Sequence, residues 1–118
     1  MERISWRSLT TIEEGMMARK TGLLEPIHPG EMLLEEFMKP LGISINGLAR
    51  DLHVPPNRVS AIVNGKRGIT ADSALRLSRY FSNSPEFWLN LQASYDLRVA
   101  RRRASAEIER QVRPRRAA

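Results

Sequence analysis

Two neighbouring polar residues, Asn57 and Arg58, are the side chains in this 118-residue chain best suited to reading nucleic acid. They stand early in a segment whose apolar residues recur at the spacing of one buried helical face, namely Val59, Ile62 and Val63. On the outward side of such a helix, asparagine can bond bidentately to adenine and arginine to guanine. Ala61, one turn later, is short enough to touch a thymine methyl group. The alternative reading is an ordinary solvated helix end.

A basic stretch that contains no acid surrounds this segment. Between Val54 and Thr70 the charged residues are Arg58, Lys66 and Arg67. Asn64, Lys66 and Arg67 lie just past the expected helix, where a loop would meet a phosphate backbone. Ser44 stands at the expected N-terminus of the preceding helix, where backbone N–H groups attract anions. For Lys66 and Arg67 the alternative is a solvated loop.

The elements that would position these residues are all helical, and no segment resembles a strand. The first helix begins at Pro29 and is stopped by Pro40 and Gly42. Ser44 caps a helix over Ile45–Leu52, and a turn at residues 53–55 leads to a third helix that starts at Pro56 and ends at residues 64–65. His53 occupies a turn position that favours a positive φ, where glycine is common.

Two further helices follow. Thr70 caps the fourth, whose inner face is expected to contain Ala74, Leu75, Leu77 and either Tyr80 or Phe81. Ser84 and Pro85 start the fifth, whose apolar stripe contains Phe87, Trp88, Leu91 and Tyr95. This helix can continue into an Arg-rich region until Pro114 forbids it. Residues 27–100 therefore form one helical domain between a poorly ordered N-terminal arm (1–26) and a basic C-terminal tail (101–118).

Formal charge is concentrated at the C-terminus. Residues 98–118 hold eight arginines and two glutamates, whereas residues 1–97 hold eleven basic and eleven acidic residues. The tail alone therefore carries the net charge of +6, which suits a polyanionic partner or simply solubility. Met17 is a possible alternative translation start. Apolar runs reach three residues, so neither a membrane span nor an export signal is expected, and the chain is expected to be cytoplasmic.

The sequence gives little indication of a catalytic site or a metal site. There is no cysteine, and the two histidines, His28 and His53, have no partner at helical spacing, so no metal site and no cofactor are expected. No nucleophile–base pair is visible, and we expect no enzyme. The early acids favour a solvated acidic face or a surface for a basic protein partner; they are Glu31, Glu35 and Glu36.

With these motifs in place, residues 27–100 resemble the HigA-type antitoxins of the XRE helix-turn-helix family. The segments that carry the resemblance are HPGE (28–31), LAR (48–50), VSAIVNGKRG (59–68), ITADSALRL (69–77) and, most specifically, SPEFWLNLQASYDL (84–97). The resemblance implies a five-helix, lambda-repressor-like fold and a homodimer that binds a palindromic operator in double-stranded DNA and represses its own operon. It also implies a protein partner, a HigB-type mRNA-cleaving toxin.

Matching the repressor motif residue by residue assigns roles to eight positions. The base-facing positions are Pro56, Asn57, Arg58 and Ala61. The phosphate-facing positions are Ser44, Asn64, Lys66 and Arg67. Three departures from the family pattern are Pro55 for the usual polar cap, Pro56 for a frequent polar base contact and His53 for glycine. The two prolines shift readout onto Asn57 and Arg58.

Two other functions are compatible with the same residues. The chain could be a stand-alone XRE regulator, in which case no short basic open reading frame lies beside its gene. It could also be a protein-interaction module whose helix-turn-helix no longer binds DNA, an alternative that the double proline at residues 55 and 56 keeps open.

Overall fold

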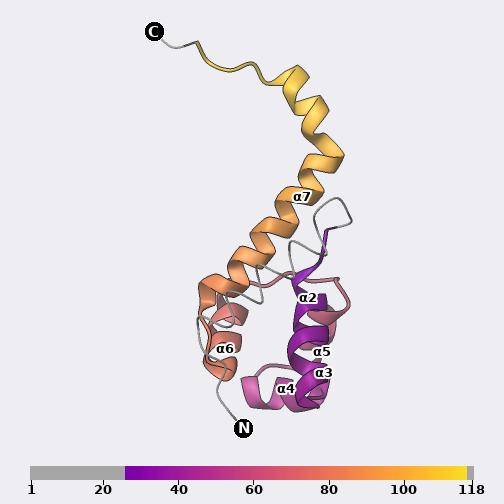
Figure 1. Ribbon diagram of the computed structural model, residues 1–118, viewed down its shortest axis with the longest axis vertical. Coiled ribbons are helices and arrows are strands. Elements are labelled where there is room, and N and C mark those ends of the chain that lie inside the picture. The colour runs from indigo at the N-terminus through magenta and orange to yellow at the C-terminus, as the bar shows by residue number, and fades with distance from the viewer. Residues whose placement is uncertain (1–25, 117–118) are drawn as a thin grey trace.

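The computed structural model describes residues 26–116, and within that range it contains helices and no strand. A continuous helical segment is made of α2 (Pro29–Met32), the π-helical turn η1 (Leu33–Met38) and α3 (Lys39–Leu41). It is followed by α4 (Ile45–Leu52), α5 (Pro56–Val63), α6 (Ala71–Phe81) and α7 (Pro85–Gln111). The helices from α2 to α6 form a compact body, and α7 projects from it (Figure 1). The predicted all-α, five-helix architecture is confirmed, and the predicted arm lies outside the described residues apart from Pro26.

Side-chain caps fix where three of these helices begin. Ser44 Oγ accepts the N–H of Gly47 at 3.0 Å, and Ser84 Oγ accepts that of Phe87 at 3.1 Å. Thr70 Oγ1 does the same for the N–H of Ser73 at 3.3 Å. Each bond satisfies a backbone donor that the helix itself leaves without a partner. The three predicted caps are therefore confirmed.

The end of the first helical segment differs from expectation. Pro40 was expected to stop the helix, but it lies inside α3. The π-helical turn precedes it, with the N–H of Lys39 donating to Leu34 O five residues back. A proline lacks the N–H that would continue a regular ladder, and a widened turn accommodates that loss. The segment ends at Gly42, as expected, and its φ of 66° is in the left-handed region that glycine adopts without strain.

The core is centred on Trp88, which is fully buried. Phe37 packs against it with ring centroids 5.0 Å apart, and Phe81 and Phe87 complete the aromatic cluster. Aliphatic side chains from the other helices surround this cluster, including Leu33, Leu48, Val59, Ile62 and Leu77. The core therefore draws side chains from the first helical segment, α4, α5, α6 and α7.

The expected inner face of α6 is partly wrong. Ala74 and Leu77 are buried, but Leu75 is 59 % exposed. Of the two aromatic candidates, Phe81 packs on the core, whereas Tyr80 lies at the surface and donates to Asp51 Oδ2 at 3.0 Å. On a helix that turns about 100° per residue, the buried side of α6 is made by residues 73, 74, 77 and 78, and Leu75 and Tyr80 lie outside that side.

The C-terminal helix is 27 residues long and ends at Gln111, three residues before the proline expected to forbid it. Its first turns pack on the body through three buried side chains, Phe87, Trp88 and Leu91. Its later turns extend beyond the other helices (Figure 1). It crosses the boundary expected at residue 100 without a break. Within residues 26–116, no helix is both long enough and apolar enough to span a membrane.

Candidate nucleic-acid interface

Helices α4 and α5 form a helix-turn-helix with one side of α5 exposed. Val59 and Ile62 anchor α5 in the core, at 2 % and 3 % exposure. Asn57 and Asn64 are exposed on the opposite side, together with Pro56 at the start of the helix. Four residues are only partly buried, namely Arg58, Ser60, Ala61 and Val63. The expected division of the helix is therefore confirmed at its two extremes, whereas Val63 is less deeply buried than predicted and the other three are less exposed.

The turn between the two helices depends on a histidine in a strained conformation. His53 has φ 58° and ψ 48°, so the positive φ expected at this position is confirmed. The N–H groups of His53 and Val54 donate to Arg50 O and Ala49 O, and these bonds close the end of α4. A left-handed residue that is not glycine costs roughly 1–2 kcal/mol. Neighbouring contacts must therefore hold this turn in place.

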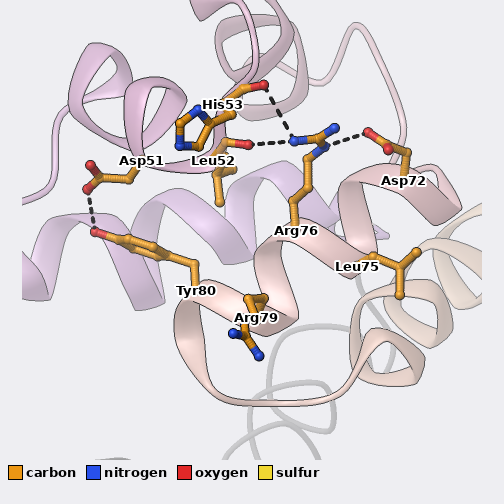
Figure 2. Close-up of a pocket in the computed structure, with 8 residues that line it drawn as sticks. All are labelled: Asp51, Leu52, His53, Asp72, Leu75, Arg76, Arg79 and Tyr80. Carbon is orange, nitrogen blue, oxygen red and sulfur yellow. Dashed lines mark hydrogen bonds and ion pairs between the residues drawn. The ribbon is translucent and has the colours of Figure 1, made fainter.

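Arg76 of α6 supplies such contacts. Its Nη1 donates to Leu52 O at 2.8 Å and to His53 O at 3.4 Å, the two carbonyls at the end of α4. Its Nε donates to Asp72 Oδ2 at 2.9 Å, as Figure 2 shows. Cations at a helix C-terminus are favourable because the carbonyls there carry partial negative charge. Arg76 therefore ties the turn to α6.

The same carboxylate holds Arg58. Arg58 Nη1 donates to Asp72 Oδ2 at 2.6 Å, and the Arg58 side chain is 25 % exposed. The hydrogen bonds from Arg76 and then from Arg58 lower the pKa of Asp72 below its ordinary value. The sequence predicts that Arg58 faces outward. In the structure its side chain extends from the first turn of α5 to Asp72 of α6. A guanidinium has five N–H donors, so this bond leaves others for a ligand.

Neither Asp72 nor Arg76 was among the residues singled out by the sequence. Asp72 lies fourteen residues after Arg58, and Arg76 lies 24 residues after Leu52. The available signal was the Asp–Arg pair at i,i+4 spacing on α6, which is common on solvated helices. These side chains also line a shallow pocket of about 470 Å³ between α4 and α6, whose lining includes Leu75 and Arg79 (Figure 2).

A close backbone contact supports α5 from behind. Gly30 of α2 is buried, and a Cβ atom built on it would lie 1.7 Å from Ile62 O. Only glycine permits this approach, because any side chain would overlap the carbonyl of α5. His28 caps the same helix, since its Nδ1 accepts the N–H of Gly30 at 2.9 Å. The position of α5 is therefore coupled to the start of α2.

The ring of His28 also links α2 to α7. It contacts Tyr95 edge-on, with ring centroids 4.9 Å apart. Burial lowers the pKa of His28 below its ordinary value of 6.5, and the nearby charges of Asp96 and Glu31 partly oppose this. A neutral imidazole suits its role, because a protonated Nδ1 could not accept the bond from α2.

The loop after α5 presents the expected basic residues. Asn64, Lys66 and Arg67 are all exposed, and the N–H groups of Lys66 and Arg67 both donate to Ala61 O. The end of the loop is fastened by Gln92 of α7, whose Oε1 accepts the N–H of Ile69 at 2.7 Å. Gln92 was not predicted, because its partner lies 23 residues away in sequence.

The remaining predicted site residue, Ser44, is exposed at the N-terminus of α4. The structure therefore places Ser44, Asn57 and the loop residues at the surface, and it brings Arg58 together with Asp72. Their contacts with DNA stay a prediction. Of the early acids, Glu31 is exposed, whereas Glu35 forms an ion pair with Lys39 at 2.8 Å. Within residues 26–116, no group of three side chains could hold a metal ion.

Comparison with known proteins identifies the family. Residues 34–88 match the helix-turn-helix family model. The whole of an addiction module antidote protein of the HigA family from Coxiella burnetii aligns with 78 % of this chain, at 51 % identity and a TM-score of 0.74. This chain belongs to the HigA family.

Two further relatives are similar to this chain, and the first is also named HigA. A structure of the Pseudomonas aeruginosa antitoxin HigA with the higBA promoter is 47 % identical, with a TM-score of 0.74, and the match covers 76 % of this chain and 98 % of that one. Virulence-associated protein I of Dichelobacter nodosus is 57 % identical over 74 residues, which make up 63 % of this chain and 68 % of that protein.

Proposed function

We propose that this HigA-family chain is a dimeric antitoxin that represses its own operon by binding a palindromic operator. The observation that carries the proposal is the exposed side of α5, which is flanked by a basic loop and backed by a packed core. The Pseudomonas aeruginosa antitoxin HigA, 47 % identical, has been solved with its promoter. In a dimer, two copies of α5 would enter successive major grooves about 10 bp apart.

Base readout would come from the first turns of α5. Asn57 suits adenine, Arg58 suits guanine through the donors that Asp72 does not use, and Ala61 suits a thymine methyl group. Pro56 would contact the groove without a polar group to contribute. Phosphate contacts would come from the α4 N-terminus and the loop after α5, namely from Ser44, Asn64, Lys66 and Arg67.

The second half of the function is neutralisation of a HigB-type, mRNA-cleaving toxin. Glu31 is exposed on α2 and would suit a basic partner. The chain would neutralise the toxin by binding it, without catalysis, and would do so in the cytoplasm. The binding domain would span residues 27–100.

The decisive experiment has two parts. Footprinting on the promoter of the chain's own gene should show two protected half-sites about one helical turn apart. Co-expression with the product of a neighbouring short basic reading frame should relieve the growth arrest that this product causes.

Each part has its own contrary result. A footprint without a neighbouring toxin gene would favour the stand-alone regulator. Binding to the toxin without preference for the promoter over random DNA would favour the protein-interaction module.

A further inference from the structure

The second half of α7 has no packing partner among the other described helices. The contacts of α7 with α6 and α2 rest on its first turns, where Phe87, Trp88 and Leu91 are buried. From Ala100 onward nearly every residue is exposed, yet the helix continues to Gln111 (Figure 1). A solvated helix of this length contributes nothing to the core, and its side chains are accessible to a ligand.

Positive charge dominates this projecting segment. Residues 98–116 contain eight arginines, of which Arg101, Arg103 and Arg110 are exposed on the helix. The only acids are two glutamates, and both accept hydrogen bonds from uncharged side chains. Glu107 accepts from Gln111 at 3.3 Å, and Glu109 accepts from Ser105 at 3.4 Å. Eight arginines against two glutamates leave the segment with a net charge of +6, and the complementary ligand is a polyanion.

The helix is rigidly joined to the loop that is proposed to contact DNA phosphates. Gln92 of α7 holds Ile69 at the end of that loop, at 2.7 Å. One turn later, Tyr95 packs on His28, whose ring lies about 4 Å from the position of a Cβ on Gly65 in the same loop. At 1.5 Å per residue, Arg101 lies roughly 14 Å along the helix from Gln92, and Gln111 roughly 28 Å. The basic segment thus begins about two helical turns beyond the loop contact and continues away from the body.

We propose that residues 98–116 form a second phosphate-binding surface, which contacts double-stranded DNA flanking the segment held by the helix-turn-helix. This inference rests on the proposed operator binding. The contact would be electrostatic and independent of sequence, because arginines on a projecting helix reach phosphates before base edges. DNA is favoured over a lipid surface because only two large apolar residues of the segment are exposed, namely Ile108 and Val112.

The test compares two variants of the full chain. In the first, Arg103 and Arg110 are both changed to glutamine, which removes two charges from one side of the helix and keeps good helix formers. In the matched control the same two residues are changed to lysine, which keeps the charge. Binding is measured against salt on three duplexes: about 20 bp centred on the footprint, about 50 bp with natural flanks, and about 50 bp of random sequence.

On both long duplexes, the glutamine variant should reduce the slope of log K against log salt by about 1.8, which is 0.9 for each lost phosphate contact. Between about 50 and 200 mM salt, the wild type should therefore lose roughly 12-fold more affinity than this variant. The lysine variant should match the wild type, and the short duplex should show no difference.

Equal slopes on the long duplexes would overturn the inference, and so would an equal reduction on the short one. If the wild type shows no preference for its promoter, the proposed function fails. The random duplex then still decides whether this helix binds phosphates.

Discussion

Replacing Gly30 with alanine tests how α5 is held. A Cβ at this position would lie 1.7 Å from Ile62 O and 2.6 Å from Ile62 C, whereas real Cβ atoms essentially never come closer than 3.0 Å. The backbones of α2 and α5 would have to separate by roughly 1.3 Å to reach that limit. Because the obstacle is backbone, no side-chain rotation can relieve it.

The magnitude follows from two opposing effects. Overpacking a core costs about 1–3 kcal/mol, and a backbone clash belongs at or above the upper end. Alanine has a higher helix propensity than glycine by about 1 kcal/mol, which offsets part of this. We expect a net loss of about 2–3 kcal/mol, which for a domain of this size lowers Tm by roughly 10–20 °C.

Thermal and urea unfolding of Gly30→Ala measure this directly, with Asn90→Ala on an exposed position of α7 as the control. The control should change stability by less than about 0.5 kcal/mol. Operator affinity should also fall in the glycine variant at temperatures where it remains folded, because α5 is displaced. A Tm and an operator affinity that both equal those of the wild type would refute the close-approach argument.

Three further outcomes are expected. Arg58→Ala should weaken operator binding by roughly 1–3 kcal/mol and relax preference at one base step; an equal loss on random DNA would contradict base readout by Arg58. Lys66→Ala should weaken binding to all sequences alike and flatten the salt slope by about one unit, and an unchanged slope would remove Lys66 from the phosphate contacts. Because the pKa of His28 is lowered in the fold, its contribution to stability is complete above pH 6.5 and is lost as pH falls through the lowered pKa. His28→Asn keeps a capping acceptor and should remove this loss in urea titrations at successive pH values; an unaltered pH profile would show that another group causes it.

The sequence was sufficient wherever local chemistry decides the structure. Ser44, Thr70 and Ser84 were predicted as caps because a side-chain oxygen at a helix start has a fixed backbone partner three residues on. The apolar spacing around Val59 and Ile62 likewise predicted which side of α5 is buried. Both signals lie within a few residues of their effect.

What the sequence could not supply depends on partners far apart in the chain. Nothing near Arg58 indicates that its guanidinium meets Asp72, and nothing near Ile69 indicates that Gln92 fastens its N–H. The exposure of Leu75 depends on how α6 is rotated against α7. That rotation is set by the packing of the whole body rather than by the order of residues in one helix.

The most direct test of the central claim, that the outward side of α5 reads base edges, is a comparison of two asparagines. Asn57 and Asn90 are both exposed on helices, and only Asn57 lies on α5. Each is changed to alanine, and affinities are measured for the footprinted operator and for variants with one base pair replaced at a time. Asn57→Ala should lose about 1–3 kcal/mol of binding free energy together with discrimination at a single position, while Asn90→Ala should behave as the wild type. If Asn57→Ala retains full affinity and the full pattern of discrimination, the operator is read by some other surface.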